Sequence, residues 1–240
     1  LLASRRIAST WFIPGVVIGT YPELCQRISD EGHEIGHHGW THDTPASLSR
    51  DEERAALARG NEAIVSISGQ SARGYRSPAW DLSPHSVELL MEAGFAYDSS
   101  MMGADYIPYR ARMGDVVTAD EPMIFGEETA LVEMPISWSL DDYPHFEFVR
   151  AGGAILPGLQ NASGVLENWI EDYRYMRRSM EWGIITYTFH PLVIGRGHRM
   201  NILEQLITTL SSEGAEFITM ETGVSEFLKH ESANANLGGN

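Results

Sequence analysis

The sequence predicts an α/β fold, a closed or nearly closed (β/α) barrel built on about seven parallel strands. Short apolar runs, rich in β-branched and aromatic residues, alternate with longer helical patterns along the whole chain. No G-x-G-x-x-G pattern opens a strand-to-helix turn, which disfavours a doubly wound nucleotide-binding sheet. At 240 residues the chain is long for one domain but suits a single barrel.

The first five strands are predicted where an apolar run of strand length ends at a glycine, a proline or a polar cluster. They cover residues 7–13, 33–36, 71–75, 95–98 and 130–136. Two more strands are predicted over 183–189 and 215–219, and residues 99–128 show no clean period. The predicted barrel domain spans 1–230, and the Asn- and Gly-rich tail 231–240 is expected to be disordered.

Helices are predicted between these strands from apolar periodicity and from their end signals. Gly32, Gly69 and Gly94 each follow a periodic segment and are expected to end a helix. The predicted helices cover 20–31, 47–68, 83–93, 161–180, 200–212 and 221–229.

Composition limits the class of partner. The formal net charge of −16 argues against nucleic acid and against anionic membrane surfaces. No apolar run approaches a membrane span, and the single cysteine, Cys25, excludes an internal disulfide. We expect a cytoplasmic rather than a secreted protein that acts on a small molecule or a glycan. The sequence starts without methionine, so the true N-terminus is not seen. A homo-oligomer is compatible with the sequence.

A histidine cluster is the main chemical signal. Residues 32–42 hold four of the nine histidines, and His38 and His42 are spaced so that one helical turn or a tight loop directs both imidazoles the same way. With a third ligand, usually a carboxylate, they would complete a divalent-metal site. The alternative is a solvated turn in which histidines gather, because H-x-x-x-H alone is a weak motif. His33 and His37 are expected to be structural.

Polar residues gather at the carboxyl ends of the predicted strands, where the active sites of such barrels lie. This concentration favours the metal interpretation of the histidine pair over a chance cluster. The residues delivered there are His38, His42, Arg76, Ser77, Pro78, Trp80, Asp98, Trp138, Asp141, Asp142 and His190.

Each of these residues also has a plainer interpretation. Arg76 is expected to hold a carboxylate in the barrel mouth, and it could instead be a surface arginine. Asp98 could assist catalysis or could only cap the turn that follows it. Trp80 and Trp138 could form a pocket wall or belong to the core. His190, between an apolar strand and a proline, is the candidate general acid.

Four strings resemble motifs of the polysaccharide deacetylase superfamily (NodB homology, carbohydrate esterase four). "GHEIGHHGWTH" is similar to the second motif, H-x-x-x-[HS], and "YRSPAW" to the third. "YDSSM" around Asp98 resembles the fourth motif, and "TFHP" around His190 resembles the fifth. The likeness runs from about residue 1 to residue 230 and implies a distorted (β/α) barrel.

The resemblance implies a hydrolase of non-peptide carbon–nitrogen bonds that removes an N-acetyl group with a divalent metal, zinc first and cobalt, nickel or manganese as alternatives. It assigns the metal to His38 and His42 together with an aspartate. The catalytic assignments are His190, Arg76 and Asp98, with an oxyanion donor expected from the backbone near Ser77. The expected substrate-binding residues are Ser77, Pro78, Trp80, Trp138 and Asp142.

The printed sequence departs from the family at one motif. The metal-binding aspartate and the catalytic base of the family form an Asp-Asp pair on the first strand, and no such pair precedes residue 7. We therefore expect the first strand and helix to precede Leu1, and this stretch alone to be inactive or to rely on another segment. Asp141 and Asp142 follow a different strand, so we interpret them as a pocket-lining or loop pair.

Two further strings leave the substrate open. "WSLDDYPHF" and "HPLVIGRGHRM" resemble the branch that contains Helicobacter peptidoglycan-deacetylase-like proteins, cyclic imide hydrolases and allantoinase relatives. A cyclic imide or another small amide is therefore the alternative to an acetylated sugar. A barrel that binds a sugar or amide without chemistry is the second alternative. A serine hydrolase is disfavoured because no G-x-S-x-G elbow is present.

Overall fold

The computed structural model describes residues 1–147, 149–151, 154–156 and 158–237. Its internal contacts divide the chain into two compact units. We call Leu2–Met101, Pro108–Met134 and Phe217–Asn240 the sheet unit. We call Met102–Ile107 and Pro135–Glu216, with Leu1, the helical unit. Each unit is described by itself below.

The sheet unit is built on a six-stranded sheet in the order β1-β2-β3-β4-β6-β5, which confirms the predicted α/β fold. Neighbouring strands from β1 to β6 run parallel, and β5 pairs antiparallel with β6. The strands are β1 (Thr10–Ile13), β2 (Glu34–His37), β3 (Gly74–Tyr75), β4 (Tyr97–Asp98), β5 (Tyr109–Met113) and β6 (Glu127–Glu133). The first five predicted strands are thus present as β1, β2, β3, β4 and β6.

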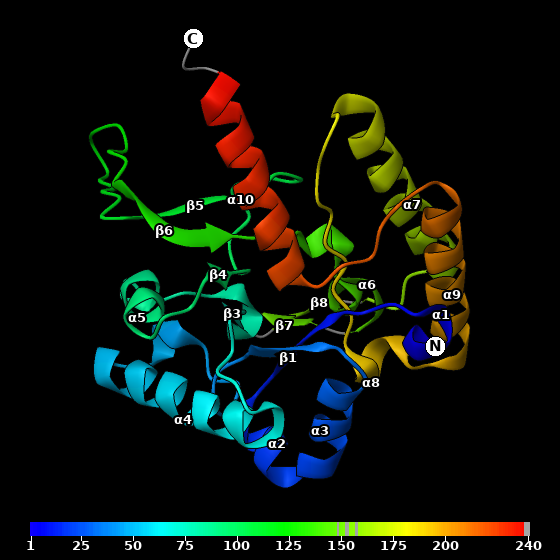
Figure 1. Ribbon diagram of the computed structural model, residues 1–240, viewed down its shortest axis with the longest axis horizontal. Coiled ribbons are helices and arrows are strands. Elements are labelled where there is room, and N and C mark those ends of the chain that lie inside the picture. Colours follow the sequence, from blue (N-terminus) through cyan, green and yellow to red (C-terminus); the bar gives the residue numbers. More distant parts are fainter. Residues whose placement is uncertain (148, 152–153, 157, 238–240) are drawn as a thin grey trace. The chain divides into compact units, whose positions relative to one another are not determined.

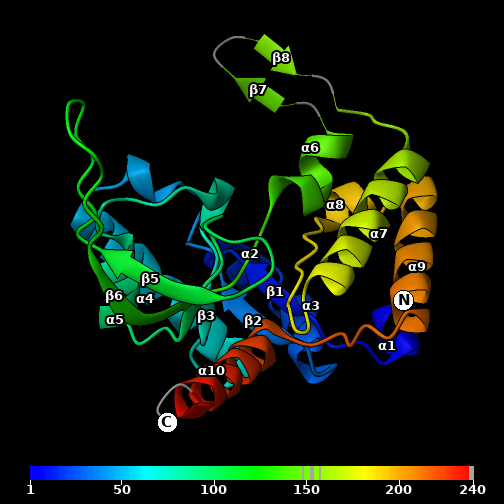
Figure 2. The same cartoon turned by 90° about the horizontal axis from the view of Figure 1, so that it is seen from above.

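The strand prediction was wrong at several places, and it also lacked the short pair β7–β8 described below. β5 lies within 99–128, where no period was found, and it joins β6 in the long hairpin that Figure 2 shows. Residues 183–189 form no regular strand and make one isolated bridge, Asp141 to Thr188, while 215–219 are irregular. Residues 183–189 are mostly half-buried and 215–219 are half-buried or exposed, so β-branched composition alone did not decide sheet pairing, which depends on partner strands elsewhere in the chain.

Helices of the sheet unit cover one side of strands β1 to β3, as Figure 1 shows for α2 (Gly15–Thr20), α3 (Pro22–Asp30) and α4 (Arg50–Ser68). The core between them is apolar and includes Ile18, Leu57, Ile64 and Leu89. The other helices of this unit are α1 (Leu2–Arg5), α5 (Ser86–Glu92) and α10 (Met220–Leu237). Helix α10 extends to Leu237, past the predicted domain end at residue 230, and residues 238–240 lie outside the described residues.

The ends of α4 show how local sequence sets a boundary. Ser49 and Glu52 form a reciprocal capping box in which each side chain accepts the other residue's backbone N–H. At the other end Gly69 adopts the left-handed conformation, with φ 75°, and its N–H donates to the Val65 carbonyl. Gly69 lies where the sequence predicted the helix to end, whereas the helix begins at Arg50, three residues after the predicted start.

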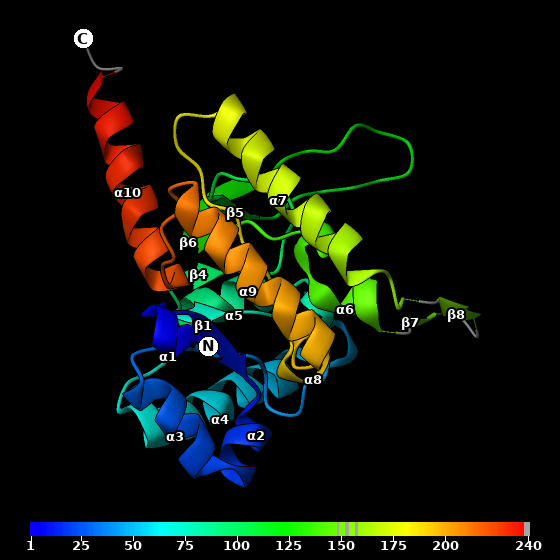
Figure 3. The same cartoon turned by 90° about the vertical axis from the view of Figure 1, so that its right-hand side faces the viewer.

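The helical unit contains α6 (Asp142–Phe146), α7 (Ala162–Ser179), α8 (Pro191–Ile194) and α9 (Gly197–Ser212). Helices α7 and α9 lie side by side (Figure 3). Trp169 of α7 is fully buried among Phe146, Tyr187 and Phe189, with edge-on ring contacts. Strands β7 (Val149–Ala151) and β8 (Ala154–Leu156) pair antiparallel. Among the residues that the structure describes, no helix is both long enough and apolar enough to cross a membrane.

Gly60 lets the middle of α4 approach His37 at the end of β2. A methyl group at Gly60 would lie 2.2 Å from Nε2 of His37. That nitrogen hydrogen-bonds the Leu57 carbonyl at 3.1 Å, and Nδ1 of the same ring accepts the Gly39 N–H at 3.1 Å. His37 is thus a buried link between α4 and the loop after β2, as expected for a structural histidine.

We expect Gly60→Ala to lower the free energy of unfolding. Helix propensity alone favours alanine by about 1 kcal/mol, but overpacking at a buried contact costs about 1–3 kcal/mol and the His37 hydrogen bond must also distort. Urea unfolding measures the difference. Gly19→Ala is the matched control, because Gly19 lies in α2 with open space around it and alanine there should not destabilise. A stabilised Gly60→Ala would contradict the close approach.

Candidate functional site

The loop after β2 carries the predicted metal-binding histidines and is not helical. Gly39 and His42 both have left-handed backbones, with φ 71° and 68°. For a residue with a side chain this conformation costs about 1 kcal/mol, and such strain gathers at functional sites. The N–H of Gly15, at the start of α2, donates to the Gly39 carbonyl at 3.0 Å and fixes the loop.

His38 and His42 lie next to each other, with ring centroids 4.9 Å apart. Nδ1 of His38 is 2.6 Å from the Arg76 carbonyl oxygen, so it must carry the proton and donate it. Burial lowers the pKa of His38 to about 3, which keeps the ring neutral. The Nε2 lone pair then points away from the carbonyl and can bind a metal, the tautomer that backbone carbonyls select in metal sites.

The histidine pair therefore fits a divalent transition metal in its chemistry. Both ligands are imidazoles, one is oriented by a carbonyl, and the exposed ring of His42 leaves the pair accessible. His33 is not part of this pair: its Nδ1 lies 3.1 Å from both the N–H and the hydroxyl of Ser9.

Arg76 follows β3 and is buried at 7% exposure. Its Nε donates to the Ser99 carbonyl at 3.1 Å and its Nη2 to the Ser99 hydroxyl at 2.8 Å. The guanidinium also lies over the Phe12 ring, 4.6 Å from its centroid. The surface alternative for Arg76 was wrong, and its charge lowers the pKa of the neighbouring Asp98, though less than burial raises it.

Ser77 and Pro78 do not suit the substrate contacts expected of them. Both are buried, and the Ser77 N–H already donates to the Ser100 hydroxyl at 2.8 Å, so it cannot also bind an oxyanion. Pro78 begins the 3₁₀ turn Pro78–Trp80 under Gly39. Trp80 is half-buried, with φ 55°, and its predicted contact with substrate stays a prediction.

Asp98 is fully buried at the end of β4, and its register partner on β6 is Glu133. Its Oδ1 accepts the Ser100 hydroxyl at 2.6 Å. The interpretation of Asp98 as a group that holds the following turn is therefore supported. Glu133 was not among the residues predicted from the sequence, although a charged residue inside the apolar run 130–136 is an available signal.

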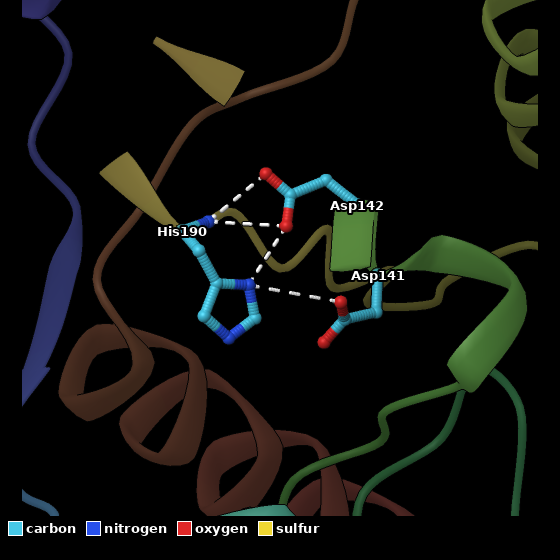
Figure 4. A group of neighbouring side chains, drawn as sticks. All are labelled: Asp141, Asp142 and His190. Atoms are coloured by element: carbon cyan, nitrogen blue, oxygen red, sulfur yellow. Dashed lines mark hydrogen bonds and ion pairs between the residues drawn. The ribbon is translucent and has the colours of Figure 1, made fainter. Parts of the chain in front are cut away.

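In the helical unit, Asp142 and His190 form a hydrogen-bonded pair, which Figure 4 shows. Nδ1 of His190 lies 2.7 Å from Oδ1 of Asp142, and the His190 backbone N–H donates to both carboxylate oxygens at 3.1 and 3.0 Å. Asp142 is fully buried, whereas the His190 side chain is 38% exposed. The carboxylate holds the proton on Nδ1, so proton exchange with a substrate would use Nε2.

Backbone pairing brings these two residues together from distant parts of the chain. The Asp142 N–H donates to the Thr188 carbonyl at 3.0 Å, and the Thr188 N–H donates to the Leu140 carbonyl at 2.9 Å. Asp141 caps α6 by accepting the Tyr143 N–H at 2.7 Å. The prediction that Asp142 contacts substrate is not supported, because its carboxylate is buried against His190. Trp138, in the turn Trp138–Leu140, is 41% exposed, and its predicted role stays a prediction.

Asp141, Asp142 and His190 also lie close enough to form a possible metal site. Two observations favour a hydrogen-bonded pair over a metal cluster. The nearest atoms, Nδ1 of His190 and Oδ1 of Asp142, are at the distance of a charge-assisted hydrogen bond, and Asp141 is occupied as a helix cap. A cation would have to displace both interactions.

Known proteins match the chain over nearly its whole length. A family model described as polysaccharide deacetylase matches residues 1–97. A peptidoglycan deacetylase of Helicobacter pylori is 32% identical over 240 residues, covering 95% of this chain and 82% of that protein. The chain belongs to the polysaccharide deacetylase family. A peptidoglycan deacetylase-like protein of Gibberella zeae is 27% identical, and the match covers 91% of this chain and 70% of that relative.

Solved structures agree with the family. A Mycobacterium smegmatis protein assigned as a polysaccharide deacetylase has a TM-score of 0.80 at 30% identity, covering 96% of this chain and 75% of its own. An allantoinase has a TM-score of 0.74 at 18% identity, covering 94% and 68%, which is a likeness of fold alone. The fold is thus that of the polysaccharide deacetylases, and the allantoinase shares it.

We expect His42→Ala to weaken zinc binding by at least about tenfold, because one of two imidazole ligands is lost. Isothermal titration with zinc measures the affinity. Asp141→Asn should leave it unchanged, since the asparagine oxygen can still accept the Tyr143 N–H. His198→Ala, at an exposed histidine of α9, is the control for non-specific binding. Loss of affinity in Asp141→Asn but not in His42→Ala would move the metal to the cluster around His190.

Proposed function

We propose that this protein is a metal-assisted hydrolase that removes the N-acetyl group from an acetylated amino sugar of a polysaccharide such as peptidoglycan. The observation that carries the proposal is the oriented pair of His38 and His42, with Nδ1 of His38 fixed on the Arg76 carbonyl. The peptidoglycan deacetylase of Helicobacter pylori, similar over 95% of the chain, supports the substrate class.

In this proposal His38 and His42 hold the metal in the sheet unit. When bound there, a divalent metal such as zinc would polarise the amide carbonyl and lower the pKa of a bound water. Arg76 keeps the His38 ring in the tautomer that exposes Nε2, through its own carbonyl. Gly15 and His37 fix the loop that carries both histidines, so little reorganisation is needed before a ligand binds.

His190 acts as the general acid in the helical unit. Asp142 accepts a hydrogen bond from the Nδ1–H of His190 at 2.7 Å and stabilises the imidazolium. The proton on Nε2 can then pass to the leaving nitrogen. The full burial of Asp142 strengthens this charge-assisted bond. Deacetylation needs such a proton because an amine is a poor leaving group until it is protonated.

A cyclic imide or another small amide is the second candidate substrate. Two likenesses support it: the fold shared with the allantoinase, and the resemblance of segment 138–146 to the branch that contains cyclic imide hydrolases. The two candidates share the metal and the general acid and differ only in the shape of the amide. A barrel that binds its ligand without chemistry is the third candidate, and only turnover separates it from the others.

We expect the complete protein, with any segment that supplies the Asp-Asp pair expected for the family, to turn over N-acetylglucosamine oligomers faster than succinimide and allantoin. Released acetate is measured for the oligomers, and ring opening for the cyclic amides, each with added zinc and with a chelator. Activity that chelation abolishes and zinc restores supports the metal-assisted reaction. Preference for succinimide or allantoin would favour the second candidate, and binding of oligomers without turnover would favour the third.

We expect His190→Ala to lower kcat by about 10²–10⁴-fold, the usual range for a lost general acid, while zinc content stays unchanged. Asp142→Asn should also lower kcat, because an amide cannot hold the Nδ1 proton as a carboxylate does. Zinc is counted by atomic absorption beside the rate measurement. Loss of zinc in His190→Ala would make His190 a ligand and overturn its role as the acid. The matched control is His85→Ala, at an exposed histidine before α5.

A further inference from the structure

Asp98 and Glu133 form a buried carboxyl pair at the ends of two neighbouring parallel strands. They are register partners on β4 and β6, and both are fully buried. Each carries one buried oxygen, Oδ2 of Asp98 and Oε2 of Glu133, that accepts no hydrogen bond from a described residue. Two ionised carboxylates cannot satisfy each other, because a carboxylate only accepts. A proton on one of the two groups supplies the donor that is missing.

The other contacts of the pair indicate where that proton lies. Glu133 Oε1 accepts the N–H groups of Ser100 and Met101, each at 2.7 Å. Asp98 Oδ1 accepts the Ser100 hydroxyl at 2.6 Å. The remaining oxygens, Asp98 Oδ2 and Glu133 Oε2, receive no donor from any described residue. A single proton between these two oxygens satisfies both, and buried polar atoms are rarely left without a partner.

The charges around the pair agree with one proton. The Arg76 guanidinium, which follows β3, acts on Asp98, and Tyr75, the last residue of β3, is the register partner of Asp98. Burial raises the pKa of Tyr75, so its phenol stays neutral. One proton leaves the pair with a single negative charge, which balances Arg76. Full ionisation would leave an excess buried charge, which is costly.

We propose that Asp98 and Glu133 share one proton between Oδ2 and Oε2, and that this pair positions Arg76 and Ser77, the segment after β3 whose Arg76 carbonyl contacts His38. The part that concerns catalysis rests on the proposed function, whereas the shared proton does not.

The positioning follows from two hydrogen bonds that leave the turn after β4. The pair fixes Ser99 and Ser100, because Ser100 donates to both carboxyls. Ser99 then accepts Arg76 through its carbonyl and hydroxyl, and the Ser100 hydroxyl accepts the Ser77 N–H at 2.8 Å. The Arg76 carbonyl in turn orients His38. A carboxyl pair that contacts neither substrate nor metal ligand directly thus holds the segment that does.

Burial is the first cause that raises the pKa of both carboxyls, and the charge of Asp98 raises that of Glu133 further. A carboxyl whose pKa is raised by folding binds its proton more tightly in the folded state than in the unfolded chain. Stability is therefore lost as the pH rises from the ordinary carboxyl pKa to the raised one. Glu133→Gln removes this dependence, because the amide accepts through Oε1 and donates permanently to Asp98 through its nitrogen.

The first test is infrared spectroscopy of the full protein at neutral pH, with urea unfolding followed across the acid-to-neutral range. We expect a band of a buried protonated carboxyl that is absent in both Glu133→Gln and Asp98→Asn. The ratio of the wild-type to the Glu133→Gln unfolding constant should rise by up to tenfold per pH unit, one proton's worth. No such band in the wild type, or a ratio independent of pH, overturns the shared proton.

The second test separates positioning from general stability. Glu133→Leu removes both hydrogen-bonding functions, so we expect zinc affinity and kcat to fall while KM changes little, and Glu133→Gln to restore both. Equal loss in Glu133→Gln and Glu133→Leu overturns the positioning role. If the wild type has no deacetylase activity, the proposed function fails, and the infrared band and zinc affinity still decide the pair. If Glu133→Leu does not fold, Asp98→Asn provides the test, because its side-chain amide then donates to Glu133, the opposite direction to the hydrogen bond in Glu133→Gln.

Discussion

Arg76 connects three strand ends of the sheet unit, and the arrangement of the candidate metal site depends on it. Its N–H donates to the His37 carbonyl of β2 at 2.9 Å, and its own carbonyl accepts Nδ1 of His38 at 2.6 Å. Its side chain binds Ser99, after β4, through two donors. Because a parallel sheet places these ends side by side, one residue can satisfy buried groups from all three.

Burial sets the chemistry of the groups around Arg76. It lowers the pKa of His38, which stays a neutral ligand, and raises the pKa of Asp98 and Glu133, which favours a shared proton. The same environment makes each hydrogen bond in the network stronger and each missing one more costly. Burial therefore favours the neutral form of His38 and a protonated carboxyl in the Asp98–Glu133 pair, because it disfavours the charged form of every group.

In the helical unit, the candidate general acid His190 is oriented in a different way. His190 is half-exposed, and its orientation comes from a buried aspartate on a short helix rather than from a strand end. Trp169 and the surrounding rings pack beneath the segment that carries His190, and Trp169 Nε1 donates to the Ser139 carbonyl at 2.9 Å. Irregular backbone can be held this precisely because its polar groups are paired and its apolar side chains are buried.

Much of this could be predicted from sequence, and the successes share a physical basis. Gly69, which ends α4, acts through local backbone chemistry, so a glycine after a periodic helical segment predicts a helix end from the sequence alone. The alternation of strands and helices predicted a parallel α/β fold for the same reason. The sequence strings around His38, Arg76 and His190 also resembled the family to which the chain belongs.

The misses concern pairs that are distant in the chain. Asp142 meets His190 across 48 positions, and Glu133 meets Asp98 only through the register of β4 with β6. Sequence determined which side chains were available at the strand ends and how the helices begin and end. Only the tertiary structure decided which carboxyl faces which partner, because burial and hydrogen bonding between distant segments, rather than local propensity, fix those contacts.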